Sequence, residues 1–162
     1  MGKMLVIDIN KCTGCHTCEL ACSFAHNGEF NPLKSRIHVS FFVEQATGIP
    51  VVCQQCNEAW CAKICPAGAI TIEKDEVTGA TLVKVSEEKC VGCKMCTLAC
   101  PFGGIVVSDK GHAEKCDLCG GDPECVKFCY PGALKFTKPE LGMIARKQGL
   151  AQRILASYKE VK

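Results

Sequence analysis

Large aromatic side chains are scarce in this sequence, and no apolar run is long. Of its 162 residues, seven are Phe, two are Tyr and one is Trp, whereas 15 are Gly. A chain with this composition builds little apolar core, so we expect metal centres or crosslinks to supply part of its stability. No window is long and apolar enough to cross a bilayer, which argues against a membrane span.

The N-terminal stretch MGKMLVIDIN lacks the features of an export signal. Its apolar part is too short, it leads directly into charge and cysteine, and no twin-arginine pair is present. We therefore expect a cytoplasmic protein, in a compartment where structural disulfides are rare and clustered cysteines indicate metal. The formal net charge is only +2, so no nucleic-acid partner is expected.

Cysteine is abundant, with sixteen residues in four groups of four and none left over. Groups one and three have the spacing C-x2-C-x2-C-x3-C, and a proline follows group three, as in the bacterial ferredoxin run for cubane iron–sulfur clusters. Groups two and four keep the first x2 and the last x3 around longer middle gaps. The four groups are Cys12, Cys15, Cys18 and Cys22; Cys53, Cys56, Cys61 and Cys65; Cys90, Cys93, Cys96 and Cys100; and Cys116, Cys119, Cys125 and Cys129.

The spacing predicts how each group divides its ligands. Three closely spaced cysteines can wrap around one cluster, whereas the x3 gap places the fourth cysteine one helical turn farther on, facing a second cluster. Spacing alone leaves two pairings open: group one with four and two with three, or one with two and three with four. A zinc-binding scaffold module is the alternative of a different class, but zinc sites do not require this run followed by proline.

The segments between the groups predict short strands and single helical turns, which makes the fold class α+β. Each x3 segment is expected to form one helical turn, and Gly68, Gly103 and Gly132 are expected to turn the chain into the next strand. Further short strands are expected after Cys100 and after Cys129. Other strands are predicted over Met4–Ile9 and Arg36–Glu44, in the return through Val51 and Val52, and in a hairpin of Ala69–Lys74 and Ala80–Val85.

With these four runs, the chain resembles the four-cluster ferredoxin family. That family supplies electron-transfer subunits to molybdenum and tungsten oxidoreductases, formate-linked complexes, carbon monoxide dehydrogenase partners and hydrogenases. The resemblance covers about residues 4–137 and implies two nested bacterial dicluster-ferredoxin modules. The inner module would comprise about residues 50–108, and the outer module about residues 4–35 plus 109–137.

The resemblance also implies four [4Fe-4S] clusters, with groups two and three forming the inner pair and groups one and four the outer pair. Each cluster would take three ligands from one group and one from its paired group. The implied ligand sets are Cys12, Cys15, Cys18 and Cys129; Cys116, Cys119, Cys125 and Cys22; Cys53, Cys56, Cys61 and Cys100; and Cys90, Cys93, Cys96 and Cys65.

A narrower resemblance rests on the stretch from Cys12 to Val39. It is similar to small iron–sulfur subunits that accompany tungsten enzymes of the aldehyde ferredoxin oxidoreductase family, which includes benzoyl-coenzyme A reductases. This implies a non-catalytic subunit that relays electrons between a tungsten or molybdenum catalytic subunit and an acceptor or donor. The alternative is the electron-transfer subunit of a hydrogenase, formate or carbon monoxide dehydrogenase complex.

Outside the cysteines, two single residues and the C-terminal segment also carry expectations. His16 is interpreted as a surface histidine, because the cysteines supply every ligand, and Trp60 is expected to pack beside a cluster. Residues 138–162 predict a basic helical tail. This tail would either pack on its own domain or dock on a partner subunit or another copy of the chain.

Metal analysis after anaerobic purification tests the prediction of four cubane clusters. We expect about sixteen irons and sixteen inorganic sulfides per chain, with broad visible absorption. A colourless protein with about four zinc ions and no sulfide would contradict it, because a four-cysteine zinc site contains neither iron nor sulfide.

Overall fold

A computed structural model describes residues 2–138 of the chain. Within this range no helix is long and apolar enough to span a bilayer. The tail that was predicted to dock or to pack lies, from residue 139 onward, outside the described residues. The described part consists of short strands and helices in an irregular chain, and the prediction of an α+β fold is confirmed.

Every sheet among the described residues is a pair of antiparallel strands. Four of the predicted strands are slightly shorter in the structure, whereas the strand expected at Val51 and Val52 begins already at Thr47. The pairs are β1 (Met4–Ile7) with β8 (Leu134–Thr137), β2 (Ile37–Phe42) with β3 (Thr47–Val52), β4 (Ile70–Lys74) with β5 (Thr81–Val85), and β6 (Val106–Val107) with β7 (Ala113–Glu114).

The hairpin of β4 and β5 shows why local sequence determines most of these pairs. Asp75 accepts hydrogen bonds from the backbone N–H and the hydroxyl of Thr78, at 2.6 and 2.7 Å, and so closes the turn with its own side chain. Gly79 then takes a φ of 64°, which glycine adopts without strain. The register pairs Ile70 with Val85. The pairing of β1 with β8 is different, because it joins the two ends of the described chain.

The four α-helices of the described residues begin at equivalent points, because in each one the third cysteine of a group is the second helical residue. Three of them are single turns, as predicted. The prediction is wrong for group one, whose helix runs for 11 residues and ends at Gly28, with a φ of 71°. The helices are α1 (Thr17–Asn27), α2 (Trp60–Lys63), α3 (Met95–Ala99) and α4 (Glu124–Lys127).

Proline explains the different helix lengths. Pro66, Pro101 and Pro131 follow the fourth cysteine of groups two, three and four within two residues, and proline cannot continue a helix. Group one has no proline until Pro32. Its helix therefore continues until a glycine ends it.

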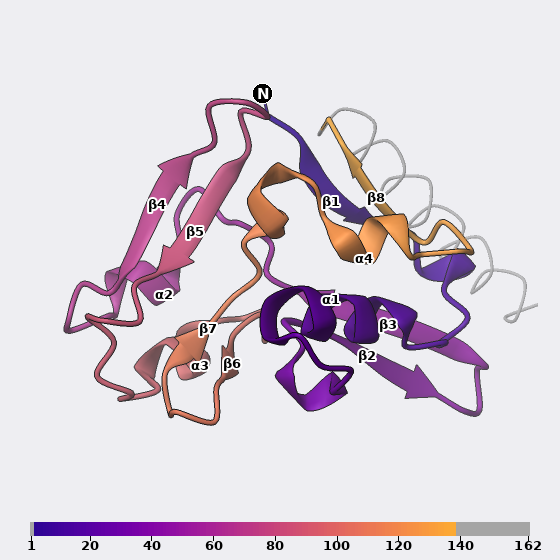
Figure 1. Ribbon diagram of the computed structural model, residues 1–162, viewed down its shortest axis with the longest axis horizontal. Coiled ribbons are helices and arrows are strands. Elements are labelled where there is room, and N and C mark those ends of the chain that lie inside the picture. The colour runs from indigo at the N-terminus through magenta and orange to yellow at the C-terminus, as the bar shows by residue number, and fades with distance from the viewer. Residues whose placement is uncertain (1, 139–162) are drawn as a thin grey trace, which may run out of the picture.

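Figure 1 shows two halves, each built around a pair of helices. α1 packs against α4 beside β1, β2, β3 and β8, and α2 packs against α3 beside β4 to β7. Each half has its own apolar cluster, with Leu118 and Leu134 buried in the first and Ile70 and Val83 in the second. Because the first half contains both the beginning and the end of the described chain, the second half lies between them in sequence.

Candidate metal centres

The structure brings the fourth cysteine of group two to the first three of group three. Cys65, Cys90, Cys93 and Cys96 line one cavity, whose total empty space, including its open side, is about 400 Å³. Ile70 and other apolar side chains complete the wall. Four thiols in an apolar cavity therefore come from two groups, with three from one and one from the other.

A second cavity repeats this arrangement with groups one and four. Cys12, Cys15, Cys18 and Cys129 line it, and its empty space is about 310 Å³. Apolar side chains around it include Val39, Pro50 and Leu134. In these two cavities, thiols of group one therefore lie beside one of group four, and thiols of group three beside one of group two.

Two further sets of thiols remain, one around Cys56 and one around Cys125. Within each set, the charge of one thiolate affects the pKa of its neighbours. Burial raises the pKa of the Cys56 thiol, and charges on Cys53, Cys100 and Cys61 raise it further, while the Lys115 ammonium lowers it.

For Cys125, burial is again the largest cause of the raised pKa. It is followed by charges on Cys116, Cys22 and Cys119, and then on Cys18. Each of these sets also combines three cysteines of one group with the fourth cysteine of its paired group.

In all four groups, the residue before the second cysteine has a left-handed backbone. It is Gly14 or Gly92 in groups one and three, with φ of 68° in both, and Gln55 (49°) or Leu118 (55°) in groups two and four. This conformation folds the C-x2-C loop tightly. It costs glycine little but costs other residues about 1–3 kcal/mol, so the surroundings of Gln55 and Leu118 must impose it.

Gln55 is held in place by two hydrogen bonds to distant segments. Its amide Nε2–H donates to the carbonyl oxygen of Cys116, and its Oε1 accepts from the backbone N–H of Val83 at 2.7 Å. The side chain therefore ties the group-two loop to group four and to β5. Sequence reasoning missed this residue, because both partners are far away along the chain.

Backbone N–H groups point at several cysteine sulfurs. Leu134 donates to Cys129 Sγ and Ala69 to Cys65 Sγ, both at 3.3 Å, and Arg36 donates to Cys22 Sγ at 3.4 Å. All three sulfurs belong to the fourth cysteine of a group. Such bonds favour the thiolate and orient it for metal.

The donors to Cys65 Sγ and Cys129 Sγ come shortly after glycine turns that the sequence predicted. Gly68 and Gly132 have φ of 57° and 65°, and each donates its N–H to the carbonyl oxygen of the preceding fourth cysteine. Gly103 makes the same turn after Cys100, with a φ of 61°. The turns lead the chain into the next segment, as the sequence predicted, and after Gly68 and Gly132 that segment donates to the cysteine sulfur.

The pKa values of the buried thiols indicate whether the sets of four cysteines fit a metal centre. Burial raises the pKa of Cys18 and of Cys116 to about 12, because a thiolate loses hydration there. A buried set of four thiols therefore binds as thiolates only with compensating positive charge, which iron supplies. Sulfur donors in sets of four fit [4Fe-4S] clusters.

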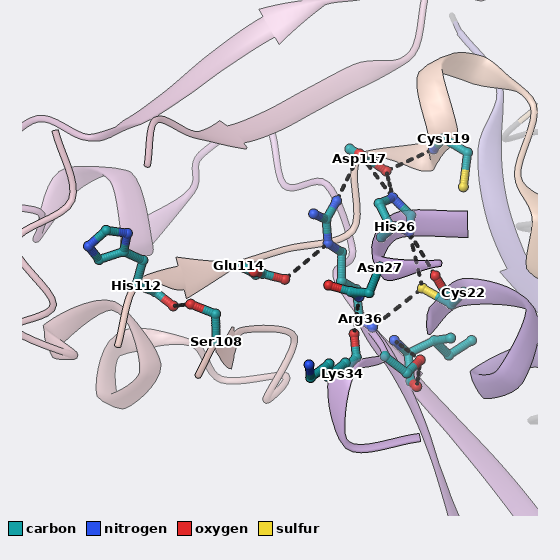
Figure 2. A network of polar contacts seen from close by, with 12 residues as sticks. Cys22, His26, Asn27, Lys34, Arg36, Ser108, His112, Glu114, Asp117 and Cys119 are labelled. Carbon is teal, nitrogen blue, oxygen red and sulfur yellow. Dashed lines mark hydrogen bonds and ion pairs between the residues drawn. The ribbon is translucent and has the colours of Figure 1, made fainter. Parts of the chain in front are cut away.

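A network of polar side chains next to Cys22 joins group one to group four (Figure 2). His26 Nε2 lies 3.0 Å from Asp117 Oδ1, and Arg36 donates from Nη1 to Asp117 Oδ2 at 2.8 Å. The hydrogen bond to Asp117, followed by that to Cys22, raises the pKa of His26 to about 10. Burial acts to raise the pKa of Cys22, but hydrogen bonds from His26 and from the Arg36 backbone N–H outweigh it and lower the pKa.

His26, Asp117 and Cys119 also offer ligand atoms within 4.8 Å of one another, as a metal site would. However, Asp117 is already hydrogen-bonded to His26 and Arg36, and Cys119 belongs to group four. We therefore interpret the three residues as support for the neighbouring thiols. The network was not predicted, because His26 carries no spacing signal.

Like Gln55 and His26, Lys115 was not predicted and has a side chain that contacts a cysteine. Its side chain is buried, and its Nζ donates to Cys61 Sγ at 3.3 Å. Burial acts to lower its pKa, but the charges of Cys53 and Cys61 outweigh burial and raise it.

His16, which was discounted as a ligand, and Trp60 both lie at the surface. His16 is 43% exposed and its Nδ1 lies 2.9 Å from a Glu19 carboxylate oxygen. Trp60 was expected to pack beside a cluster, but it is 63% exposed, with the Lys63 ammonium 5.0 Å from its ring centre.

Comparisons with known families and relatives agree with an iron–sulfur centre. A 4Fe-4S dicluster domain model matches residues 45–139, and a 4Fe-4S binding domain model matches residues 9–25. The aliphatic sulfonate oxidoreductase, polyferredoxin-like subunit of Pyrococcus furiosus is 43% identical, over 78% of this chain and 70% of that protein. Electron transport protein HydN of Escherichia coli is 36% identical, over 83% of this chain and 87% of that protein.

Other matches differ in length or are structural. The chain spans only 21% of a longer Escherichia coli protein, UacF, to which it is 40% identical. Among solved structures, a chain of the active-site complex BamBC of benzoyl-coenzyme A reductase, in complex with zinc, matches with a TM-score of 0.50 and 28% identity. That match covers 98% of this chain and 97% of the other.

Substitution of two glycines tests whether the centre that contains Cys12 is separate from the one that contains Cys53. A Cβ at Gly48 would lie 2.8 Å from Cys12 Sγ, and one at Gly104 would lie 2.7 Å from the Cys53 Cα. Both contacts are closer than real Cβ atoms make, so the neighbouring cysteine must shift. We expect Gly48→Ala to impair the centre that contains Cys12 and Gly104→Ala the one that contains Cys53, each with loss of up to about four irons. Iron analysis with Mössbauer spectroscopy measures this, and full iron in both variants would contradict it.

Proposed function

Because the chain belongs to the 4Fe-4S dicluster domain family of iron–sulfur electron-transfer subunits, we propose that it holds four [4Fe-4S] clusters in series. It would connect a tungsten or molybdenum catalytic subunit with a second electron donor or acceptor. The observation that carries this proposal is the convergence of sixteen thiols into four sets, each completed by a cysteine from another group. When bound, each cluster supplies one-electron redox chemistry that the side chains themselves lack.

The proposed ligands are the four sets implied by the sequence resemblance. Two sets are supported by the cavities that their thiols line, and two by the mutual influence of their thiols on ionisation. In order, the sets are Cys12, Cys15, Cys18 and Cys129; Cys116, Cys119, Cys125 and Cys22; Cys53, Cys56, Cys61 and Cys100; and Cys90, Cys93, Cys96 and Cys65.

This order is also the proposed order of the electron path. Cys18 influences the ionisation of Cys125, which supports neighbouring first and second sets, and Cys53 influences that of Cys116, which supports neighbouring second and third sets. The third and fourth sets exchange their fourth cysteines. Cys15 and Cys93, in the first and last sets, are exposed, so the two ends of the path reach the surface.

The surroundings of the exposed ends fit contacts with redox partners. Near Cys93, Val91 and Leu98 are 69% and 85% exposed, and exposed apolar side chains favour protein contacts. Near Cys15, the ring of Phe41 lies over Gly14 and is 45% exposed. We propose one of these ends as the contact with the catalytic subunit and the other as the contact with the second redox partner.

The domain division that we propose is nested. The inner module comprises about residues 50–108, and the outer module about residues 4–35 plus 109–137. The pairing of β1 with β8 and the packing of α1 on α4 support an outer module built from both ends of the sequence. The packing of α2 on α3 supports an inner module from the middle of the chain.

The kind of catalytic partner is proposed from two observations. The stretch from Cys12 to Val39 resembles small subunits of tungsten enzymes, and a chain of a benzoyl-coenzyme A reductase active-site complex matches over nearly its whole length. The Pyrococcus furiosus relative is likewise a subunit of an oxidoreductase. The tail beyond residue 138 is proposed as an additional docking element for a partner subunit or another copy of the chain.

Substitution of Cys100 tests the exchange of ligands between groups. We expect Cys100→Ala to remove the same spectroscopic signal as Cys56→Ala, because both would ligate one cluster, and to lower iron from about sixteen to about twelve per chain. Cys96→Ala is the matched control, and it should remove a different signal. EPR spectra and iron content of the reduced proteins measure the effect. If Cys100→Ala and Cys96→Ala removed the same signal, the proposed exchange would be wrong.

Purification of the native complex tests the proposed partner. We expect the chain to co-purify with a larger subunit that contains tungsten or molybdenum, measured by mass spectrometry of the proteins and of the metals. A large subunit with nickel and iron would instead identify a hydrogenase or carbon monoxide dehydrogenase complex. Such an outcome would contradict the tungsten or molybdenum assignment while leaving the electron-transfer role intact.

A further inference from the structure

Lys115 has an unusual environment for a lysine. It lies between the end of β7 and Cys116, and only 7% of the residue is exposed. Lysine is almost never fully buried unless its ammonium is paired. Within residues 2–138, no carboxylate forms an ion pair with Lys115, and the groups that attract its ammonium are sulfurs.

The Lys115 ammonium contacts the third set of cysteines, and the residue that follows Lys115 belongs to the second set. Nζ donates to Cys61 Sγ at 3.3 Å and also faces Cys53, both in the third set. The next residue, Cys116, belongs to the second set. A unit positive charge at this distance from a sulfur, in a region with little water, acts far more strongly than it would at the surface.

In the other three sets, no cation without a carboxylate partner contacts a sulfur among the described residues. Their hydrogen bonds to sulfur come from backbone N–H groups or neutral hydroxyls, with one exception. The exception is His26, whose Nδ1 lies 3.8 Å from Cys22 Sγ and only 2.9 Å from the Cys22 carbonyl oxygen. His26 also carries a positive charge, since its pKa is raised to about 10, but its Nε2 is paired with the Asp117 carboxylate at 3.0 Å. Among the described residues no carboxylate pairs with Lys115, so the charge that Lys115 brings to the third set is not offset in this way.

We propose that Lys115 selectively raises the reduction potential of the cluster bound by Cys53, Cys56, Cys61 and Cys100. This inference rests on the proposed function, because it requires clusters in these sets. A cluster gains negative charge when it is reduced, so a fixed cation and its hydrogen bond to a ligand sulfur stabilise the reduced form more than the oxidised form. Lys115 acts through Cys61 and Cys53 and is a positioning and tuning residue rather than a ligand.

The test compares three full-length variants after anaerobic purification with their clusters. Lys115→Met removes the charge while keeping much of the length, and Lys115→Arg keeps the charge. Lys110→Met is the matched control, because Lys110 is 75% exposed and pairs with Glu87 at the surface. Redox titrations monitored by EPR measure the potential of each cluster.

We expect Lys115→Met to lower the reduction equilibrium constant of one cluster about tenfold, which is 59 mV for one electron. The shifted signal should be the one that Cys100→Ala removes. The other three potentials should stay unchanged, as should all four in Lys110→Met. Lys115→Arg should stay nearer to the wild-type protein than Lys115→Met.

Three outcomes would overturn the proposal. One is four unchanged potentials in Lys115→Met with full iron, and another is a shift of a different cluster. The third outcome concerns a loss of iron in Lys115→Met. In that case Lys115→Gln serves as a second neutral variant. Loss of the same cluster in Lys115→Gln would show that Lys115 is needed to hold the cluster and does not merely tune its potential. Iron and sulfide analysis of the wild-type protein separates these failures from failure of the proposed function, which would show as fewer than about sixteen irons.

Discussion

The buried thiols impose the constraint on which the rest of this structure depends. A thiolate that loses its hydration is stable only beside positive charge, and burial raises the pKa of Cys18 and Cys116 to about 12 without it. In the proposed function, metal at each set of four thiols would remove this cost and join segments that are distant in sequence. This would explain how a chain with four two-stranded sheets among its described residues and few aromatic side chains can be ordered.

Two cavities are each lined by thiols from two cysteine groups, so they bring segments together that are separate in sequence. A loop such as Cys90 to Cys96 is local, but its cavity is completed by Cys65 from the other side of the β4–β5 hairpin. The β4–β5 hairpin and the turn at Gly68 lie beside the first of these cavities, and Gln55 adds a link between groups two and four, which neither cavity joins. Cohesion therefore comes from repeated links between groups rather than from one continuous apolar core.

Local sequence patterns predicted the features whose causes are local. The x3 gaps and following prolines predicted α2, α3 and α4, and the alternating segments predicted the hairpins. The length of α1 was missed because the prediction used the cysteine spacing and ignored the absence of a proline before Pro32. The pairing of β1 with β8 could not be predicted, because its register depends on residues about 130 positions apart.

The same distinction applies to the site. Cysteine spacing identified the donors, and the family resemblance was needed to choose a pairing. Gln55, His26 and Lys115 were missed because each acts on a residue distant in sequence: Cys116, Asp117 and Cys61 respectively. The position of Lys115 directly before Cys116 gave no signal, because Lys11 and Lys89 also directly precede the first cysteine of a group.

The position of Cys129 in the cavity of Cys12, Cys15 and Cys18 has a consequence for biosynthesis. A ribosome releases group one first, yet that cavity lacks its last thiol until the chain has been translated beyond residue 129. The cavity of group three, by contrast, is complete once residue 96 has emerged, because Cys65 precedes it. The middle of the chain can therefore mature while the first-made cysteines still wait, and a truncated translation product would carry an open, reactive thiol set at its N-terminal end.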